Sequence, residues 1–184
     1  EAMQLLMGYN SFNGYVWNKL FDLQLIREND IRFHADYPAC EDTMFVGSYL
    51  YHCSRVCVTE ECLYCYRQVS GGANRGRYSG RKAYDPKWMS VFEMTEYMAD
   101  LYKDDAVTAA CRLHEVREAG IVLRSMEAAG YHGADHARLK GILRRGASLF
   151  FRDENSGRSQ KLSVLLSCIS PKLELAVWKL RNRK

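Results

Sequence analysis

Apolar residues in the second half of the chain recur every three or four positions, which is the spacing of one helical face. The clearest case follows Asp85-Pro86, where a capping residue precedes a proline in the first helical turn. Further helices are expected at about 105–129, at about 134–151 and after Ser170-Pro171. The helix after Asp85-Pro86 is predicted to face a core with Trp88, Val91, Phe92, Thr95, Met98, Leu101 and Tyr102.

The first half mixes one helical pattern with strand-like patterns. A helix is expected to begin at Glu41 and to end near Cys53, because apolar residues follow two acids at helical spacing. β-Branched and aromatic residues predict a strand at 15–21 and an antiparallel hairpin at 55–59 and 62–67. The predicted fold class is α+β with a high helix content.

Residues 70–82 separate these two halves. They read SGGANRGRYSGRK, are rich in glycine, serine and arginine, and show no apolar periodicity, which is typical of a flexible loop. The expected organisation is one part at 1–70, a Gly/Arg loop at 71–84 and a helical extension at 85–184.

The charge of the chain divides in a similar way. The net charge is +4, but residues 1–70 hold five Lys/Arg against nine Asp/Glu, whereas residues 71–184 hold 21 against 13. The basic half is the one expected to meet an anionic partner such as a phosphate, a phospholipid surface or a nucleic acid. Solvated helix faces explain the same charges equally well, so both interpretations stay open.

The sequence carries no signal for membrane insertion or secretion. No apolar run reaches the roughly 18 residues that a membrane-spanning helix requires. The start, EAMQLLMGYNSFNG, lacks the basic segment, apolar core and cleavage site of a secretory signal. These first residues resemble the end of a helix running into a turn, so the sequence is expected to begin within a longer protein.

Seven cysteines form an odd set, which favours reduced thiols in a cytosolic protein. The spacing of Cys53, Cys57, Cys62 and Cys65 would allow a zinc or iron–sulfur site. The residues between them favour strands over the glycine turns of a metal knuckle, and Cys62 and Cys65 would point to opposite faces of a strand. Buried apolar thiols are the preferred interpretation, and no metal ligand is assigned within the chain.

Several short motifs of residues 1–75 occur in an order that resembles one enzyme family. GYVWNKLF at 14–21 is followed by LQLIREN, by IRF, by Glu41-Asp42 at a helix start and by LYCYRQVSGG at 63–72. This combination resembles the second half of a family 2 glycosyltransferase, of the bacterial type that modifies surface polysaccharide. The resemblance implies the acceptor-side part of a GT-A α/β fold with a C-terminal helical extension.

The resemblance also implies a mechanism. Asp42 would be the base that accepts the proton of the acceptor hydroxyl in an inverting displacement, and Glu41 would help to position it. The donor would be a nucleotide sugar and the acceptor a saccharide. Substrate-binding roles are implied for Trp17, Asn18, Lys19, Arg67 and Ser70.

The nucleotide-binding lobe of that family has no counterpart in the sequence. Its Asp-x-Asp motif, which binds Mg²⁺ or Mn²⁺, is missing, so the ligands of that divalent cation would lie outside this chain. The chain alone is therefore expected to be inactive. The family also implies a cytoplasmic enzyme, with the inner face of the membrane as a candidate location.

A non-catalytic helical module is the alternative. The tail KLELAVWKLRNRK places Leu173, Trp178 and Leu180 beside Lys172 and Lys179, which suits an interfacial helix on an anionic membrane. It also suits an ordinary packed helix with a basic end. A nucleic acid or a protein partner would be other candidates for the basic half. Nucleic acid is not expected, because no helix-turn-helix, zinc-finger or RNA-recognition signature is present.

Overall fold

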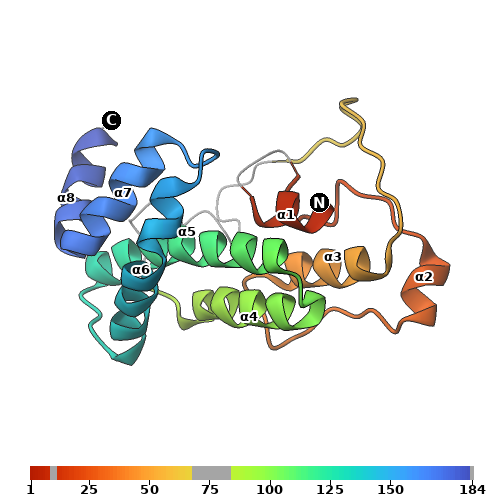
Figure 1. Cartoon of the computed structure of the whole chain (residues 1–184), viewed down its shortest axis with the longest axis horizontal. Helices are drawn as coiled ribbons and strands as arrows, with labels where there is room; N and C mark the ends of the chain where they lie inside the picture. Colours follow the sequence, from red (N-terminus) through yellow and green to blue (C-terminus); the bar gives the residue numbers. More distant parts are fainter. Residues whose placement is uncertain (9–11, 68–83, 183–184) are drawn as a thin grey trace. The chain divides into compact units, whose positions relative to one another are not determined.

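The computed structural model describes residues 1–8, 12–67 and 84–182 (Figure 1). Within these ranges the backbone forms helices and no strand. The predicted α+β class and the α/β fold of GT-A type are therefore wrong for the described part of the chain. The helices are α1 (Ala2–Met7), α2 (Leu23–Glu28), α3 (Glu41–His52), the 3-10 turn η1 (Pro86–Met89), α4 (Ser90–Tyr102), α5 (Asp105–Ala129), α6 (Ala134–Arg152), α7 (Arg158–Ile169) and α8 (Pro171–Arg181).

The described residues group into two compact units. Unit 1 contains the described residues of 1–69 together with 87–111, and unit 2 contains 84–86 and 112–182. The division falls within α5, and α4 belongs to the same unit as the N-terminal helices. Among the described residues, no helix combines the length and the apolar character that crossing a membrane requires.

All three predicted strands are irregular backbone. Residues 15–21 form a loop with a turn at Trp17, and residues 54–67 are exposed throughout. Val58 is 76% exposed and Leu63 is 78% exposed. A strand pattern yields a strand only where a partner strand and a core cover one face, and residues 54–67 pair with no strand among the described residues.

The cysteines of residues 54–67 are exposed to solvent, like the rest of this segment. Cys57, Cys62 and Cys65 are exposed, so the preferred interpretation of buried thiols is wrong for them. Cys53, the first cysteine of the group, is half-buried, and the buried cysteines of unit 1 are instead Cys40 and Cys111, which lie in its core. The error has the same origin as the strand prediction, because burial of these thiols depended on a sheet.

Unit 1 is built around α3, which begins at Glu41 as predicted. The Tyr102 hydroxyl at the end of α4 donates a hydrogen bond to the Gly47 carbonyl of α3 at 2.8 Å, and burial raises the pKa of this tyrosine. The Tyr49 hydroxyl accepts a hydrogen bond from the Asp22 backbone N–H at 2.9 Å, which ties the start of α2 to α3. The core is rich in methionine and comprises Met3, Leu6, Met7, Cys40, Met44, Val46, Val91, Met94, Met98, Val107 and Cys111.

Unit 2 is organised around the second part of α5. This helix lies against α6, α7 and α8, and α7 also packs against both α6 and α8. Small residues allow the closest approaches, and one buried ion pair makes the contact with α8. The contacts that define this arrangement are Val116 with Gly146, Gly120 with Ser167, and Arg124 with Glu174.

The ion pair between Arg124 and Glu174 is deeply buried. Their side chains are 10% and 3% exposed, and Arg124 Nη1 lies 2.9 Å from Glu174 Oε1. The same oxygen accepts a hydrogen bond from the Ser163 hydroxyl of α7 at 2.6 Å, and the Arg124 guanidinium lies 5.1 Å from the centre of the Trp178 ring. Burial raises the pKa of Glu174, although Arg124 and Ser163 act in the opposite direction. The desolvation of this carboxylate therefore outweighs the attraction of its partners.

The glycines of α6 give a matched test of the packing of α6 against α5. A Cβ added at Gly146 would collide with the Val116 side chain, whereas one added at Gly141 would meet only the flexible end of Arg145. Ala is favoured over Gly in a helix by about 0.5–1 kcal/mol, and overpacking a core costs about 1–3 kcal/mol. We expect Gly141→Ala to raise the free energy of unfolding and Gly146→Ala to lower it, as measured by urea denaturation. Equal stabilisation by both substitutions would contradict the close approach of the two helices.

The buried ion pair predicts that a single and a double substitution have different effects. Glu174→Ala leaves the Arg124 charge buried without its partner, which should cost about 3–5 kcal/mol of unfolding free energy. The double variant Arg124→Met with Glu174→Leu removes both charges and should recover most of this loss. Urea denaturation of the two variants measures the difference, with exposed Glu154→Ala as the control. A double variant no more stable than the single one would show that the charges themselves are needed.

Candidate functional site

The predicted catalytic pair lies in the first turn of α3. Glu41 is exposed and Asp42 is half-buried. Burial lowers the pKa of Lys19, and the negative charge of Asp42 opposes this effect, which places Asp42 and Lys19 within electrostatic reach. The loop that carries Lys19 also packs on this helix start, because Gly14 lies directly against Thr43.

The Lys19 side chain makes its hydrogen bonds within its own loop. Its ammonium group donates hydrogen bonds to the Tyr15 carbonyl at 2.8 Å, to the Asn18 side-chain oxygen at 2.9 Å and to the Asn13 carbonyl. It also lies 5.0 Å from the centre of the Phe12 ring. An ammonium group has three donors, so these contacts occupy all of them. Lys19 and Asn18 therefore hold the loop together, and their predicted substrate-binding roles stay predictions.

Trp17 lies within an aromatic cluster. The centre of its ring is 5.3 Å from that of Tyr15, 4.8 Å from that of Tyr64 and 4.8 Å from that of Tyr66. These distances are typical of aromatic packing. The tyrosines thus pack around the ring that was predicted to bind sugar.

The remaining predicted site residues are not brought to Asp42 by any contact of the described residues. Arg67 is exposed and follows the aromatic cluster in sequence. Ser70 lies outside the described residues.

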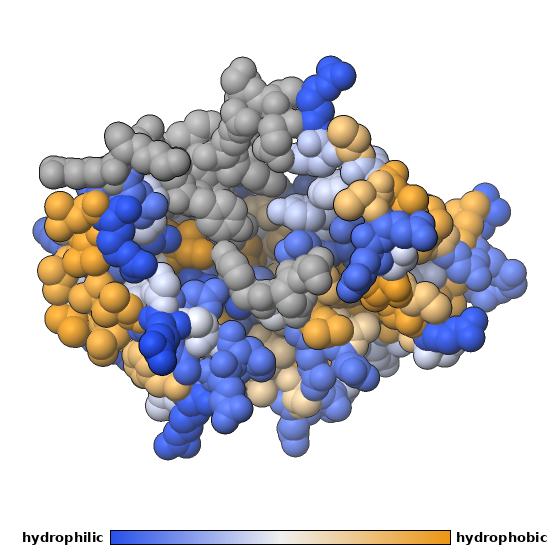
Figure 2. All heavy atoms as spheres, turned by 90° about the horizontal axis from the view of Figure 1, so that it is seen from above, coloured by the Kyte–Doolittle hydropathy of each residue, from blue (hydrophilic) through white to orange (hydrophobic). Residues whose placement is uncertain are grey.

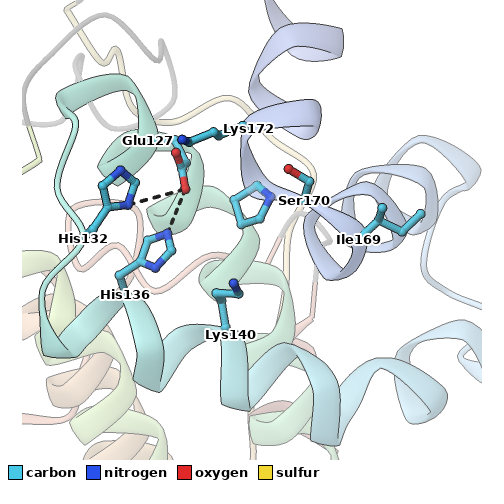
Figure 3. A pocket seen from close by; sticks show the side chains of 8 residues that line it. Glu127, His132, His136, Lys140, Ile169, Ser170 and Lys172 are labelled. Atoms are coloured by element: carbon cyan, nitrogen blue, oxygen red, sulfur yellow. Dashed lines mark hydrogen bonds and ion pairs between the residues drawn. The ribbon is translucent and has the colours of Figure 1, made fainter.

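A second group of polar side chains, which the sequence analysis did not single out, lines a pocket in unit 2 (Figure 3). Glu127 is in the last turn of α5, His132 is in the following loop and His136 is in the first turn of α6. Gly130 between them has φ +68°, a left-handed conformation that glycine adopts at no steric cost. The backbone N–H of Tyr131 then bonds the Met126 carbonyl at 2.9 Å, which closes the end of α5.

This turn brings the two imidazoles to the same carboxylate oxygen. His136 Nε2 lies 2.8 Å from Glu127 Oε1, and His132 Nδ1 lies 3.8 Å from it. The two imidazole rings are nearly perpendicular, with their centres 5.0 Å apart. The side chains of Glu127 and His136 are 4% and 13% exposed, whereas that of His132 is 48% exposed.

The pocket opens from this group toward the junction of α7 and α8. Its volume is about 310 Å³. Figure 3 shows Lys140 on α6 and Lys172 on α8 among the side chains that line it. The remaining lining residues are Ile169, Ser170 and Pro171.

A sequence signal for this group exists. Glu127, His132 and His136 form the spacing Glu-x4-His-x3-His, and a His-x3-His pair on a helix is a known arrangement of metal ligands. The signal is weak here because only His136 belongs to the helix. The glycine turn at Gly130, rather than helical spacing, brings the three residues together.

The outer sides of α7 and α8 form a third candidate region. The inner sides face α5 through Ser167 of α7 and Glu174 of α8, so both outer sides point away from α5. Figure 2 shows apolar side chains gathered on the left of the view, where Figure 1 places these helices. We call this surface the α7–α8 face, and its large apolar residues are Leu162 (43% exposed), Leu165 (44%), Ile169 (67%), Leu173 (43%) and Leu180 (62%).

The exposed charged residues of α7 and α8 are all basic. Glu174 is the only acidic residue of α7 and α8, and it is buried against Arg124. The basic residues of the two helices are Arg158, Lys161, Lys172, Lys179 and Arg181. The surface therefore combines exposed leucines with an excess of positive charge.

The chain was compared with known protein families, curated proteins and solved structures. No family model, curated protein or solved structure matches the chain.

Proposed function

We propose that this chain is a helical module that attaches peripherally to an anionic membrane surface through the α7–α8 face. The observation that carries the proposal is the set of exposed apolar residues on the outer sides of two adjacent helices whose exposed charged residues are all basic. Amphipathic helices that lie in the membrane interface have this combination. The tail pattern of the sequence is compatible with the same function for the last helix, and also with an ordinary packed helix.

The two contributions have magnitudes that fit reversible attachment. Moving a leucine or isoleucine side chain out of water yields about 1.5–3 kcal/mol when it is fully buried, and these side chains are 43–67% exposed before they meet lipid. Each basic residue near an anionic surface adds about 1 kcal/mol. Because association also costs motional freedom, the sum supports peripheral attachment and not insertion.

The glycosyltransferase activity stays an untested prediction. It relied on a sheet that the described residues do not form, and the contacts of Lys19 and Trp17 are with their own loop and with neighbouring tyrosines. The nucleotide-sugar donor, the saccharide acceptor and the Mg²⁺ or Mn²⁺ ion bound outside this chain stay predictions with it. Membrane attachment requires none of these, and a cytoplasmic location at the inner face of the membrane is part of the present proposal.

Vesicle flotation tests the apolar contribution. We expect the chain to float with phosphatidylcholine vesicles that contain phosphatidylserine, and Leu173→Ser with Leu180→Ser to lower the partition coefficient at least about tenfold. The control is Leu20→Ser with Leu63→Ser, since these leucines of unit 1 are 102% and 78% exposed. Wild-type chain that stays with the soluble fraction would rule out the proposal. An equal loss in the control would show that the α7–α8 face has no special role.

Charge reversal tests the electrostatic contribution. Arg158→Glu with Lys179→Glu should weaken flotation with anionic vesicles by about tenfold or more and have little effect on any binding to neutral ones. The matched control reverses Arg55 and Arg67, which are exposed residues of unit 1. Added salt should weaken wild-type binding to anionic vesicles, because it screens exposed charges. Binding that is equal on neutral and anionic vesicles would contradict the role of the basic residues.

A further inference from the structure

We propose that Glu127, His132 and His136 bind a first-row transition-metal ion, with Zn²⁺ or a close analogue as the expected occupant. The inference concerns the pocket of unit 2 and does not depend on attachment to a membrane. It starts from the distances between donor atoms, which are one carboxylate oxygen and two imidazole nitrogens, all within 4.8 Å of one another.

The donor set selects the class of metal. Zn²⁺ commonly binds imidazole nitrogen and carboxylate oxygen, at about 2.0–2.2 Å, whereas Mg²⁺ and Ca²⁺ prefer oxygen ligands alone. Donors at those bond lengths lie roughly 3.3–3.5 Å apart in a tetrahedral site. Metal binding would slightly lengthen the 2.8 Å separation of His136 Nε2 and Glu127 Oε1 and would bring His132 Nδ1, 3.8 Å from the same oxygen, closer. The main movement required is that of one imidazole. His132 can supply it, because it lies in a loop and its side chain is 48% exposed.

The position of Glu127 explains why a bound cation would stabilise this site. Its side chain is 4% exposed, and it lies in the last turn of α5, where the helix dipole disfavours a negative charge. A buried carboxylate needs compensating positive charge or hydrogen bonds. A structural Glu–His pair would need His136 alone, whereas the second imidazole beside the same oxygen completes a set of metal ligands.

Three protein ligands leave one coordination position open. Catalytic zinc sites have this composition, while structural sites have four protein ligands. The pocket beside the three residues is lined by Lys140 and Lys172, whose charges favour an anion over a second cation. The open position is therefore expected to bind water, hydroxide or a small anion.

Cobalt titration of the tag-free full chain tests the proposal. Co²⁺ is a spectroscopic substitute for Zn²⁺, and we expect about one equivalent to bind with visible d–d bands and without a thiolate charge-transfer band. His132→Ala should weaken binding about 100-fold or more, since loss of even an outer-shell partner of a metal ligand costs 10–100-fold. Because His132 is exposed, this variant should fold like the wild type, and the unfolding transition measured without metal verifies that it does. Exposed His52→Ala of unit 1 is the matched control and should bind like the wild type.

The free cysteines require a second control. A variant with Cys57, Cys62 and Cys65 changed to serine should keep the site, because these exposed thiols belong to unit 1. Loss of the bound cobalt in that variant, or unchanged affinity in His132→Ala, would overturn the proposal. Azide added to the cobalt form should shift the visible bands by binding at the open position. A spectrum that azide leaves unchanged would overturn the three-ligand form of the site.

Discussion

The buried contact between Arg124 and Glu174 determines which sides of α7 and α8 face solvent. It fixes α8 on α5, and the hydrogen bond from Ser163 to the same carboxylate oxygen fixes α7 beside it. Removing one partner of such a pair lowers the free energy of unfolding strongly, although the intact pair adds little net stability over two apolar residues. Burial raises the pKa of Glu174 even beside Arg124, which agrees with this balance. The pair is thus a determinant of arrangement more than a source of stability.

The same arrangement links the α7–α8 face to the histidine pocket. The junction of the two helices, from Ile169 to Lys172, lines the pocket on the side opposite the histidines. Ile169 also contributes to the exposed apolar surface, at 67% exposure. Placement of α8 by Arg124 therefore shapes two surfaces at once. The pocket depends in addition on the left-handed turn at Gly130, which sets the direction in which α6 leaves α5.

Helices α3, α4, α5, α6 and α8 could be predicted from the sequence because their signals are local, whereas α7 was not predicted as a helix. Helical spacing identified the core side of α4, and Ser170-Pro171 identified the start of α8, where the Ser170 hydroxyl accepts a hydrogen bond from the Leu173 backbone N–H at 3.4 Å. The strands failed because a strand depends on partners elsewhere in the chain, and the aromatic residues at Trp17 and Tyr64 that suggested a sheet pack on one another instead. The amphipathic pattern of α8 does not by itself decide which of its apolar residues are exposed. Its sequence gives two apolar sides, and the contact with α5 decides that Leu180 is exposed while Trp178 packs over Arg124.

The histidine pocket was missed for a related physical reason. Glu127 and the two histidines belong to different elements, and no periodicity predicts that a turn will bring them to one oxygen. Their burial also changes the meaning of the charge count. Residues 112–182 hold 13 Lys/Arg against seven Asp/Glu, but the Glu127 and Glu174 side chains are 4% and 3% exposed and are engaged with His136 and Arg124. Glu174 is withdrawn from the surface together with Arg124, so this pair leaves the balance of surface charge unchanged, and the burial of Glu127 makes the exterior of unit 2 slightly more basic than its sequence indicates.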